Sequence, residues 1–470
     1  MSFRELRATL IRGRDYFNSV SLQSLQNQHS RSEGFKGSRT TPLAVSISLF
    51  ILMAGSALGQ ITTTNFGFQC GLAKADCPNA VLPSTQAQPG MLRIWDMNVS
   101  WGELMTSYSG GVGIYNWTTL DAWLDAIAAN QPKTVWYTFG WVPCFASTGT
   151  CGSRGTATPP SDLTSSGSPM FTQFVTDFVN HCSPKGNCVK TLIKYYGTWN
   201  EANSSQYWTG TQLQLYQMIA PAWTVIQSVV SGAHLATPEI SVASGFQSWM
   251  QTWQSTEVSN GLISTDYAFH RYWVDNIPEN LMAGLNSQLC PNTGSGCSKP
   301  SGWVQLDWWV SETNYNTTSY VCNTSTYSSA DCAGQITRWQ LLLASKGASG
   351  TAWYKWMTAI GDISQSENAY YYTMQYMVGG SFSAPCSSAT ASGIQTWTCP
   401  FSEQNGTAAL WVWTPSEAGT SYVVPAAYSD YRDLNGNTTP ISTGQTVTLG
   451  VQPLLFEGTT APTHLTASVM

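Results

Sequence analysis

Charged side chains are scarce in this chain. Lys and Arg number 20 and Asp and Glu number 26 among 470 residues, which gives a net charge of −6 at pH 7. A nucleic-acid partner needs a basic face that neutralises phosphates, so this composition disfavours one. The five histidines are scattered and no C-x-x-C motif occurs, so a zinc site has little support and no cofactor is expected.

Long apolar runs are also lacking, except near the start of the chain. An apolar run at 43–52 follows a lead that contains seven basic residues, and Ala57-Leu58-Gly59 offers a cleavage site before Gln60. This pattern predicts a secretory signal peptide with a long basic n-region over residues 1–59. An uncleaved membrane anchor is the alternative, although the run is short for a full span. We therefore expect a secreted, periplasmic or cell-surface monomer that has no membrane partner after cleavage.

The 12 cysteines fall into six couples that are close in sequence. Each couple brackets a loop rich in Gly, Pro, Asn or Ser, and an even count in an exported chain predicts disulfides. Each short loop would contribute roughly 2–3 kcal/mol at most by restricting the unfolded chain. The simplest hypothesis pairs Cys70 with Cys77, Cys144 with Cys151, Cys182 with Cys188, Cys290 with Cys297, Cys322 with Cys332, and Cys386 with Cys399.

From residue 60 the pattern alternates between strand-like and helix-like segments. Helical apolar spacing occurs at 120–129, 170–181, 213–230 and 335–345. Strands that alternate with helices imply a parallel sheet, and eight such units imply a closed barrel. The predicted fold class is therefore α/β, with a (β/α)8 TIM barrel over residues 60–380. The eight predicted strands are 65–70, 91–96, 134–140, 192–199, 240–244, 267–272, 306–312 and 351–357.

After Gly379 the helical pattern disappears. Turn signals such as Asn435-Gly436 separate short runs with strand character. This predicts a small accessory β-sandwich domain over residues 381–470. A structural role is the main interpretation, and sugar binding through Trp411 and Trp413 is the alternative. The predicted strands are 408–413, 421–425, 428–434, 445–449 and 453–457.

Two glutamates close strand-like runs of the predicted barrel. Glu201 ends the fourth predicted strand and Glu312 ends the seventh. The carboxyl ends of barrel strands carry the chemistry of this fold. Either glutamate alone could be a surface or ion-paired carboxylate. Two at one barrel mouth, in a chain with 21 tryptophans whose indole faces can stack on sugars, predict hydrolysis of a glycosidic bond.

The two carboxylates would take different roles. Aromatic neighbours such as Trp199 would favour the protonated form of Glu201, which suits a general acid for the leaving oxygen. Asn200 can hydrogen-bond a sugar 2-hydroxyl, an interaction that strengthens in the transition state. Glu312 would be the ionised nucleophile. A separation of roughly 5–5.5 Å between the two carboxyl groups would give retention of anomeric configuration.

This constellation resembles glycoside hydrolase clan A, in which the acid/base follows strand four and the nucleophile follows strand seven. Within the clan the chain is most similar to family 39 and its relatives, over most of residues 62–380. Ala202 departs from the pattern, because many relatives carry proline there. The motifs that carry the resemblance are Arg93-Ile94-Trp95-Asp96, Tyr115-Asn116-Trp117, Phe139-Gly140-Trp141-Val142-Pro143 and Tyr207-Trp208-Thr209-Gly210.

The resemblance implies further site residues. Arg93 would lie near the nucleophile and help keep it ionised, with a buried structural ion pair as the alternative. His270 and Tyr272, at the end of the sixth predicted strand, would contact the nucleophile or the substrate; a histidine at the barrel rim without a catalytic part is the alternative. Trp353 would form the floor of the sugar site, in preference to Trp356 on the opposite face of the eighth strand.

The sequence as a whole predicts a secreted retaining glycosidase that acts by double displacement. Its expected partner is an oligo- or polysaccharide, with β-linked bonds expected. Trp141 and Trp208 are candidate platforms for more distant sugar units, with core packing as the alternative. A transglycosylase with the same site and a non-catalytic carbohydrate-binding surface protein are the competing hypotheses. The sequence does not predict which sugar is recognised.

Overall fold

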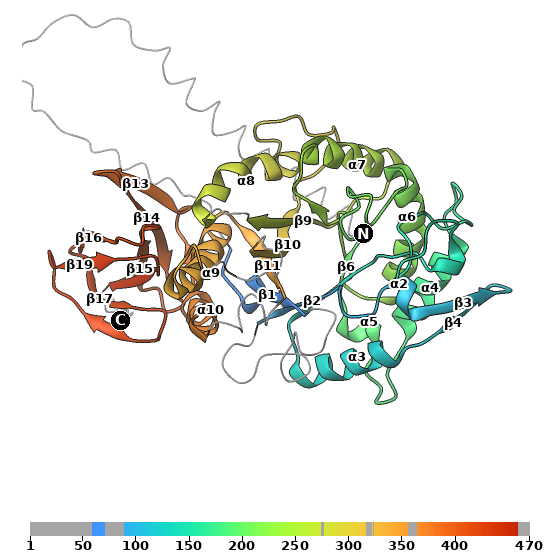
Figure 1. Ribbon diagram of the computed structural model, residues 1–470, viewed down its shortest axis with the longest axis horizontal. Helices are drawn as coiled ribbons and strands as arrows, with labels where there is room; N and C mark the ends of the chain where they lie inside the picture. The colour runs from blue at the N-terminus through green and yellow to red at the C-terminus, as the bar shows by residue number, and fades with distance from the viewer. Residues whose placement is uncertain are drawn as a thin grey trace, which may run out of the picture. The chain divides into compact units, whose positions relative to one another are not determined.

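The computed structural model describes residues 59–70, 89–273, 277–315, 322, 324–355 and 364–458 (Figure 1). All but the last residue of the predicted signal peptide lie outside this part of the chain, as do Cys77 and Trp356. Across the described residues, no helix is both long and apolar enough to span a membrane.

Within the described residues, eight parallel strands form a closed barrel (Figure 1). Each strand pairs with the next, and the last pairs with the first, so the sheet has no free edge. This arrangement confirms the predicted (β/α)8 barrel. In order around the barrel the strands are β1 (Phe66–Gln69), β2 (Met91–Ile94), β5 (Thr134–Thr138), β6 (Tyr195–Gly197), β7 (His234–Ala236), β9 (Asp266–Trp273), β10 (Asp307–Tyr315) and β11 (Ala348–Tyr354).

From β2 onward, helices lie between successive barrel strands and cover the outside of the barrel (Figure 1). Two of the predicted helices begin at sequence-encoded caps: Ser168 accepts a hydrogen bond from the backbone N–H of Phe171, and Thr211 forms a capping box with Gln214. The main helices are α3 (Thr118–Asn130), α4 (Pro169–Asn180), α6 (Gln212–Val229), α7 (Phe246–Asn260), α8 (Pro278–Thr293), α9 (Ser329–Ala344) and α10 (Ser364–Met377). Shorter elements are η1 (Thr63–Asn65), α2 (Trp101–Leu104), the hairpin β3 (Met105–Ser109) and β4 (Val112–Tyr115), η4 (Cys144–Ala146), α5 (Val189–Leu192) and β8 (Ile240–Ser241).

The position predicted for the fifth strand, 240–244, is wrong. The fifth barrel strand is β7 (His234–Ala236), which pairs with both β6 and β9. The short β8 (Ile240–Ser241) pairs only with β9. The His-Leu-Ala segment contains no β-branched residue, so its intrinsic preference for a strand is weak. It forms a strand because it pairs and packs with the strands on either side. As a consequence, Glu239 follows the fifth strand instead of preceding it.

The inside of the barrel is packed below its mouth. Apolar side chains from six strands form one buried cluster there, so the barrel is a core and not a pore. The charged residues of the barrel mouth lie next to this cluster. Its members are Met91, Trp136, Ala236, Ala268, Trp309 and Ala352.

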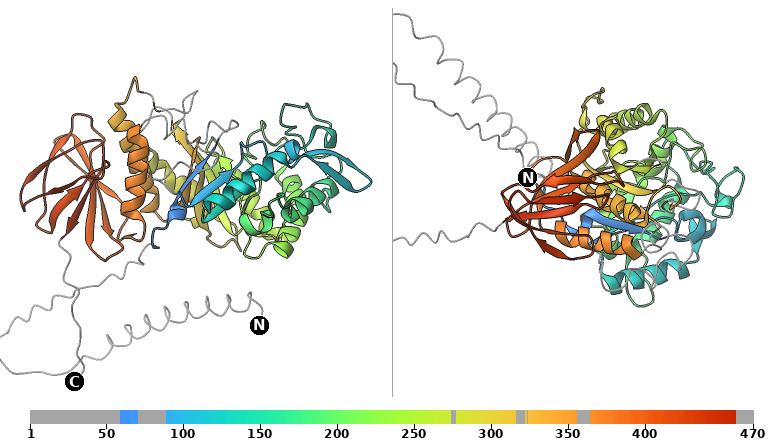
Figure 2. Two further views of the ribbon diagram at one scale, coloured as in Figure 1. Left: turned by 90° about the horizontal axis from the view of Figure 1, so that it is seen from below. Right: turned by 60° about the vertical axis from the view of Figure 1, so that its left-hand side comes forward.

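The C-terminal strands of the described chain form two antiparallel sheets, which fit the predicted β-sandwich (Figure 2). Val412 and Phe456 pack with Val447 and Leu449 of the second sheet. The larger sheet contains β12 (Ser381–Phe382), β13 (Ser387–Ala391), β14 (Ile394–Ser402), β15 (Ala408–Trp413), β17 (Tyr428–Arg432), β18 (Thr438–Pro440) and β20 (Leu454–Gly458). The smaller contains β16 (Thr420–Val423) and β19 (Thr446–Leu449).

Trp411 and Trp413 are fully buried, which favours the structural interpretation of this domain over sugar binding by these two residues. The indole Nε1 of Trp413 donates a hydrogen bond of 2.6 Å to Glu279 of α8, and the ring of Tyr376 of α10 contacts Trp411. Both tryptophans therefore join the C-terminal strands to the barrel helices.

Five of the six predicted disulfides are present. They join Cys144 to Cys151, Cys182 to Cys188, Cys290 to Cys297, Cys322 to Cys332, and Cys386 to Cys399. The sixth prediction stays untested, because Cys77 lies outside the described residues.

Candidate active site

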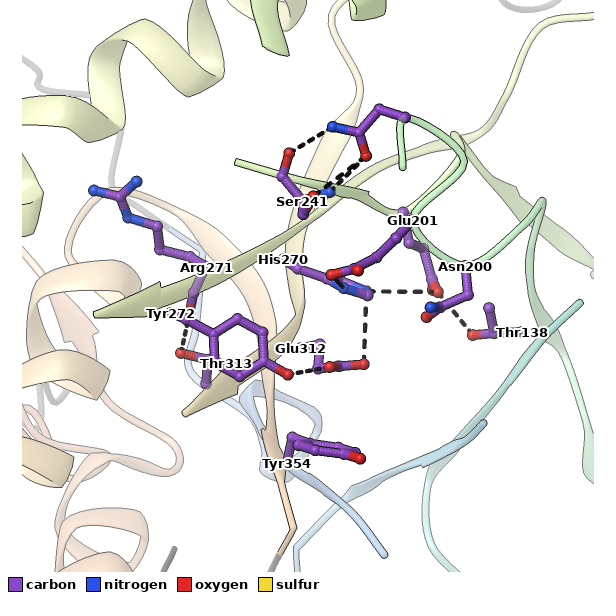
Figure 3. A network of polar contacts seen from close by, with 12 residues as sticks. Thr138, Asn200, Glu201, Ser241, His270, Arg271, Tyr272, Glu312, Thr313 and Tyr354 are labelled. Atoms are coloured by element: carbon purple, nitrogen blue, oxygen red, sulfur yellow. Dashed lines mark hydrogen bonds and ion pairs between the residues drawn. The ribbon is translucent and has the colours of Figure 1, made fainter. Parts of the chain in front are cut away.

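The carboxyl ends of the barrel strands bring Glu201 and Glu312 to one network of polar contacts (Figure 3). Glu201 follows β6, the fourth barrel strand, and Glu312 lies on β10, the seventh. The strand positions that the sequence predicts for the two glutamates are therefore correct. His270 and Tyr272 project from β9 toward the same point (Figure 3).

Glu312 is held by donors on both of its carboxylate oxygens. Arg93 Nη1 donates a hydrogen bond of 2.5 Å to Oε2, and the Tyr272 hydroxyl donates to Oε1. Burial raises the pKa of Glu312 above its ordinary value, while His270 and Arg93 act in the opposite direction. The residue is 7% exposed, so a small part of it remains open at the barrel mouth. The arrangement suits a carboxylate that is fixed in place and screened from bulk water.

Arg93 is fully buried and stands at the centre of the network. Besides Glu312 it donates to Gln69, to Asn200 Oδ1 at 2.9 Å and to Glu239 Oε2 at 2.5 Å. Burial opposes the charge of the guanidinium, but Glu239 and Glu312 outweigh burial and raise the pKa of Arg93. Arg93 is therefore a permanent cation between two carboxylates, an arrangement that fits both the predicted role beside Glu312 and the alternative of a buried structural ion pair.

His270 lies between the two predicted catalytic glutamates. Its Nδ1 is 2.9 Å from Glu201 Oε1, and its Nε2 is 3.8 Å from Glu312 Oε2. Burial opposes protonation of the ring, but Glu312, Glu201 and Glu239 outweigh burial and raise the pKa of His270 to about 9. Nδ1 therefore lies within hydrogen-bond distance of Glu201, and Nε2 lies 3.2 Å from Arg93 Nη2, which can only donate.

The backbone of Glu201 adopts an unusual conformation, with φ of 40° in the left-handed region. A side chain other than glycine is strained there, and such conformations persist only where neighbours hold them. The backbone N–H of Glu201 donates to the carbonyl of Glu239 at 2.9 Å. The turn directs the carboxylate of Glu201 toward His270 and leaves 17% of the side chain exposed. Glu201 is thus more open to a ligand than Glu312 is.

The structure does not bring Trp353 to this network. Trp353 is fully buried and packs beside Tyr315, with a ring distance of 6.1 Å, in the core between strands and helices. Its neighbour Tyr354 pairs in register with Gln69, whose side chain contacts Arg93, so Tyr354 faces the inside of the barrel. The Tyr354 hydroxyl donates a hydrogen bond of 2.5 Å to Asp96.

The two predicted outer platforms differ in placement. Trp208 is 4% exposed and packs against Trp199, with a ring distance of 5.3 Å, so it belongs to the core. Trp141 is partly exposed, and its ring lies near Tyr207 and under the guanidinium of Arg154. Of the two, Trp141 alone stays a candidate surface for a sugar ring.

Sequence reasoning missed Glu239 and Arg154. Glu239 is a fully buried third carboxylate, whose Oε2 accepts from Thr138 at 2.8 Å as well as from Arg93. Arg154 makes ion pairs with Asp96 and Glu103. One available signal was the scarcity of charge: an acidic residue between Pro238 and Ile240, at the end of a barrel strand, calls for a buried partner. Across the described residues, no cluster of His, Cys, Asp and Glu is arranged to hold a metal ion.

No protein-family model matches the chain, and no curated protein matches its sequence. Solved structures do match. A family 39 glycoside hydrolase from the gut symbiont Bacteroides cellulosilyticus WH2 aligns with a TM-score of 0.55 and 14% identity, over 79% of this chain and 75% of the other. A GH39 enzyme from Xanthomonas axonopodis pv. citri aligns with a TM-score of 0.54 and 13% identity, over 85% and 95% of the two chains.

A third similar structure is a conserved exported protein from Bacteroides fragilis, with a TM-score of 0.55 and 13% identity over 85% of this chain and 98% of the other. At this level of identity the likeness concerns the fold. It confirms, at the level of the fold, the resemblance to family 39 of clan A that the sequence predicts.

Proposed function

We propose that the protein is a secreted retaining glycosidase that hydrolyses β-linked oligo- or polysaccharides, with Glu312 as the nucleophile and Glu201 as the acid/base. One observation carries the proposal. Two carboxylates at the ends of strands four and seven meet in one polar network, in which His270 lies between them. The likeness of the fold to that of family 39 enzymes adds support.

In the first step a carboxylate oxygen of Glu312 attacks the anomeric carbon, and the bond to the leaving oxygen breaks. Glu201 gives its proton to that oxygen. Arg93 and Tyr272 hold the attacking carboxylate in place, so little reorganisation is needed as its charge is neutralised by formation of the ester bond. Asn200, whose Oδ1 is held by Arg93, can donate from its Nδ2 to a sugar hydroxyl.

In the second step a water molecule attacks the glycosyl ester. Glu201, now ionised, takes a proton from that water, and the bond between Glu312 and the sugar breaks. His270 Nδ1 lies 2.9 Å from Glu201 Oε1 and can donate a hydrogen bond to the carboxylate that this step needs. Two inversions at the anomeric carbon give net retention.

The test uses a panel of aryl β-glycosides and polysaccharides with the chain that starts at Gln60. We expect Glu312→Ala to abolish turnover. Glu201→Ala should lower kcat by about 10²- to 10⁴-fold on substrates with poor leaving groups. With azide and an activated aryl glycoside, the Glu201 variant should give the β-glycosyl azide and the Glu312 variant the α-glycosyl azide. Product configuration is read by proton NMR.

Glu257→Gln is the matched control, because Glu257 is a fully buried glutamate of α7 that bonds to Ser264 outside the network. Its activity should equal that of the wild type. Full activity in either Ala variant of Glu201 or Glu312 would refute the assignment. Transfer of the sugar to a second sugar instead of water would identify a transglycosylase, and binding without product would identify a non-catalytic protein.

The predicted export is part of the same proposal. Five short-range disulfides in the described chain favour an oxidising compartment, where such bonds persist. Ile61 exchanges backbone hydrogen bonds with Gly379 and Gly380, so the chain is bound to the barrel two residues after the predicted cleavage site. Mass spectrometry of the secreted protein should find Gln60 at its N-terminus.

A further inference from the structure

Glu239 is a third carboxylate at the base of the site, and the mechanism above gives it no role. It is fully buried, so it cannot touch a substrate. All of its polar atoms are nevertheless engaged. Trp136 Nε1 donates to Oε1, while Thr138 and Arg93 donate to Oε2. Burying a carboxylate has a large desolvation cost, even when several donors bond to it. Glu239 therefore needs an explanation in terms of structure or function.

The side chain of Glu239 acts on the nucleophile through Arg93. Arg93 Nη2 bonds to Glu239 and Nη1 bonds to Glu312, both at 2.5 Å. The guanidinium is planar, so fixing one of its nitrogens fixes the direction in which the other donates. Burial opposes the charged form of Glu239, but Arg93 and His270 outweigh it and lower its pKa to about 2. Glu239 therefore offers Arg93 a permanent anionic anchor.

The backbone of Glu239 acts on the acid/base. Its carbonyl accepts from the N–H of Glu201, and its own N–H donates to the carbonyl of Trp199. These two bonds clamp the turn in which Glu201 has a φ of 40°. The fold also makes room for the side chain at this place, because a Cβ on Gly197 would lie 2.6 Å from Glu239 Oε1.

We propose that Glu239 is a positioning residue that couples the two catalytic glutamates, holding the nucleophile through Arg93 and the acid/base through its backbone. This proposal rests on the proposed function for its catalytic consequence. Four ionisable groups face His270: Arg93 of β2, Glu312 of β10, and Glu201 and Glu239, which follow β6 and β7. Loss of the charge of Glu239 removes one of the three anions that stabilise the imidazolium, so the network should change its protonation as well as its geometry.

The decisive variant is Glu239→Gln. It keeps the shape and the backbone bonds, but its NH2 group must face one of the donors that now bond to the carboxylate. We expect kcat to fall by about 10- to 100-fold, the effect of losing a hydrogen bond to a charged group. KM should change little, because Glu239 does not reach the substrate. The midpoint of His270 titration, followed by NMR of 13Cε1-labelled histidine, should move to lower pH.

Glu257→Gln should leave kcat and the His270 titration unchanged, which separates the effect from loss of any buried carboxylate. If Glu239→Gln fails to fold, Gly197→Ala displaces the carboxylate while keeping its charge, and it should lower kcat with the His270 midpoint nearly retained. A folded Glu239→Gln with wild-type kcat and wild-type His270 titration would overturn the proposal. The NMR readout does not need catalysis, so it still decides the matter if the glycosidase assignment itself fails.

Discussion

Arg93→Met should destabilise the protein by an amount that depends on pH in a specific direction. Arg93 is fully buried and pairs with Glu239 and Glu312, whose side chains are 0% and 9% exposed. Removing one partner of a buried ion pair costs about 3–5 kcal/mol, because the remaining charge keeps its desolvation penalty without its attraction. We expect a loss of this size at pH 7.

The sign of the pH dependence follows from Glu239. In the wild type its pKa is lowered to about 2, so it contributes stability that is present above its ordinary pKa of 4.5 and lost as pH falls through 2. Without Arg93, burial dominates over the remaining attraction of His270, and the pKa of Glu239 rises above 4.5. The folded variant then keeps a proton that the unfolded chain releases. Its stability therefore falls as pH rises above 4.5, opposite to the wild-type trend.

Urea unfolding at pH 4.5 and pH 7, followed by tryptophan fluorescence, measures both effects. The gap between wild type and variant should be present at pH 4.5, where the wild type still keeps most of the contribution of Glu239, and larger at pH 7. Lys185→Met is a suitable control, because Lys185 is 74% exposed and pairs with Asp125 at the surface. Exposed pairs contribute little, so this variant should unfold like the wild type at both values. A loss in Arg93→Met that is equal at both pH values, or larger at pH 4.5, would refute the reasoning.

Two further variants test single groups. Burial raises the pKa of Glu257 to about 8, so the folded protein keeps a proton that the unfolded chain releases above pH 4.5, and stability falls from pH 4.5 to 8. Glu257→Gln should remove this fall in stability. In urea unfolding the variant should be more stable than the wild type at pH 8, by up to roughly 4–5 kcal/mol, and little different at pH 4.5. A variant as stable as the wild type at pH 8 would contradict this. Tyr272→Phe removes a hydrogen-bond donor to Glu312, and it should lower kcat by about 10- to 100-fold while Tm stays unchanged. An unchanged kcat would exclude a role of Tyr272 in holding the nucleophile.

The sequence located Glu201 and Glu312 because each ends a strongly patterned strand. The run before Glu312 is rich in Trp and Val, and the run before Glu201 contains two tyrosines and a tryptophan. Such residues favour strands on their own, so local preference and the final fold agree. The barrel then follows from the number of alternating units, without knowledge of any long-range contact.

Glu239 was missed for the opposite reason. The fifth strand is short and contains His234, Leu235 and Ala236, which carry little strand preference, whereas the following Ile240 and its neighbours carry more. Placing the strand six residues late put Glu239 before it, where no catalytic residue is expected. Only pairing with β6 and β9 shows that Glu239 stands at the mouth of the barrel.

The prediction of Trp353 for the floor of the sugar site, in preference to Trp356, shows a second limit. Strands of a parallel barrel are buried on both faces, so alternation separates the two faces without saying which one looks inward. The register decides: Tyr354 pairs with Gln69, whose side chain reaches Arg93, whereas Trp353 packs with the helices. The resemblance pointed to Trp353, whereas it is Tyr354 whose hydroxyl donates to Asp96.

Because charged residues are scarce in this chain, a buried network of five ionisable side chains is not expected to arise by chance. A buried ion needs a partner of opposite sign, and a chain with few charges has few accidental partners to offer. Glu201, Glu239 and Glu312 come from different parts of the barrel mouth and meet Arg93 and His270, so carboxyl groups outnumber basic groups by one. Of the three carboxyl groups, Glu201 is the most exposed. A proton entering from the barrel mouth therefore has Glu201 as its accessible acceptor, which is the position that an acid/base requires.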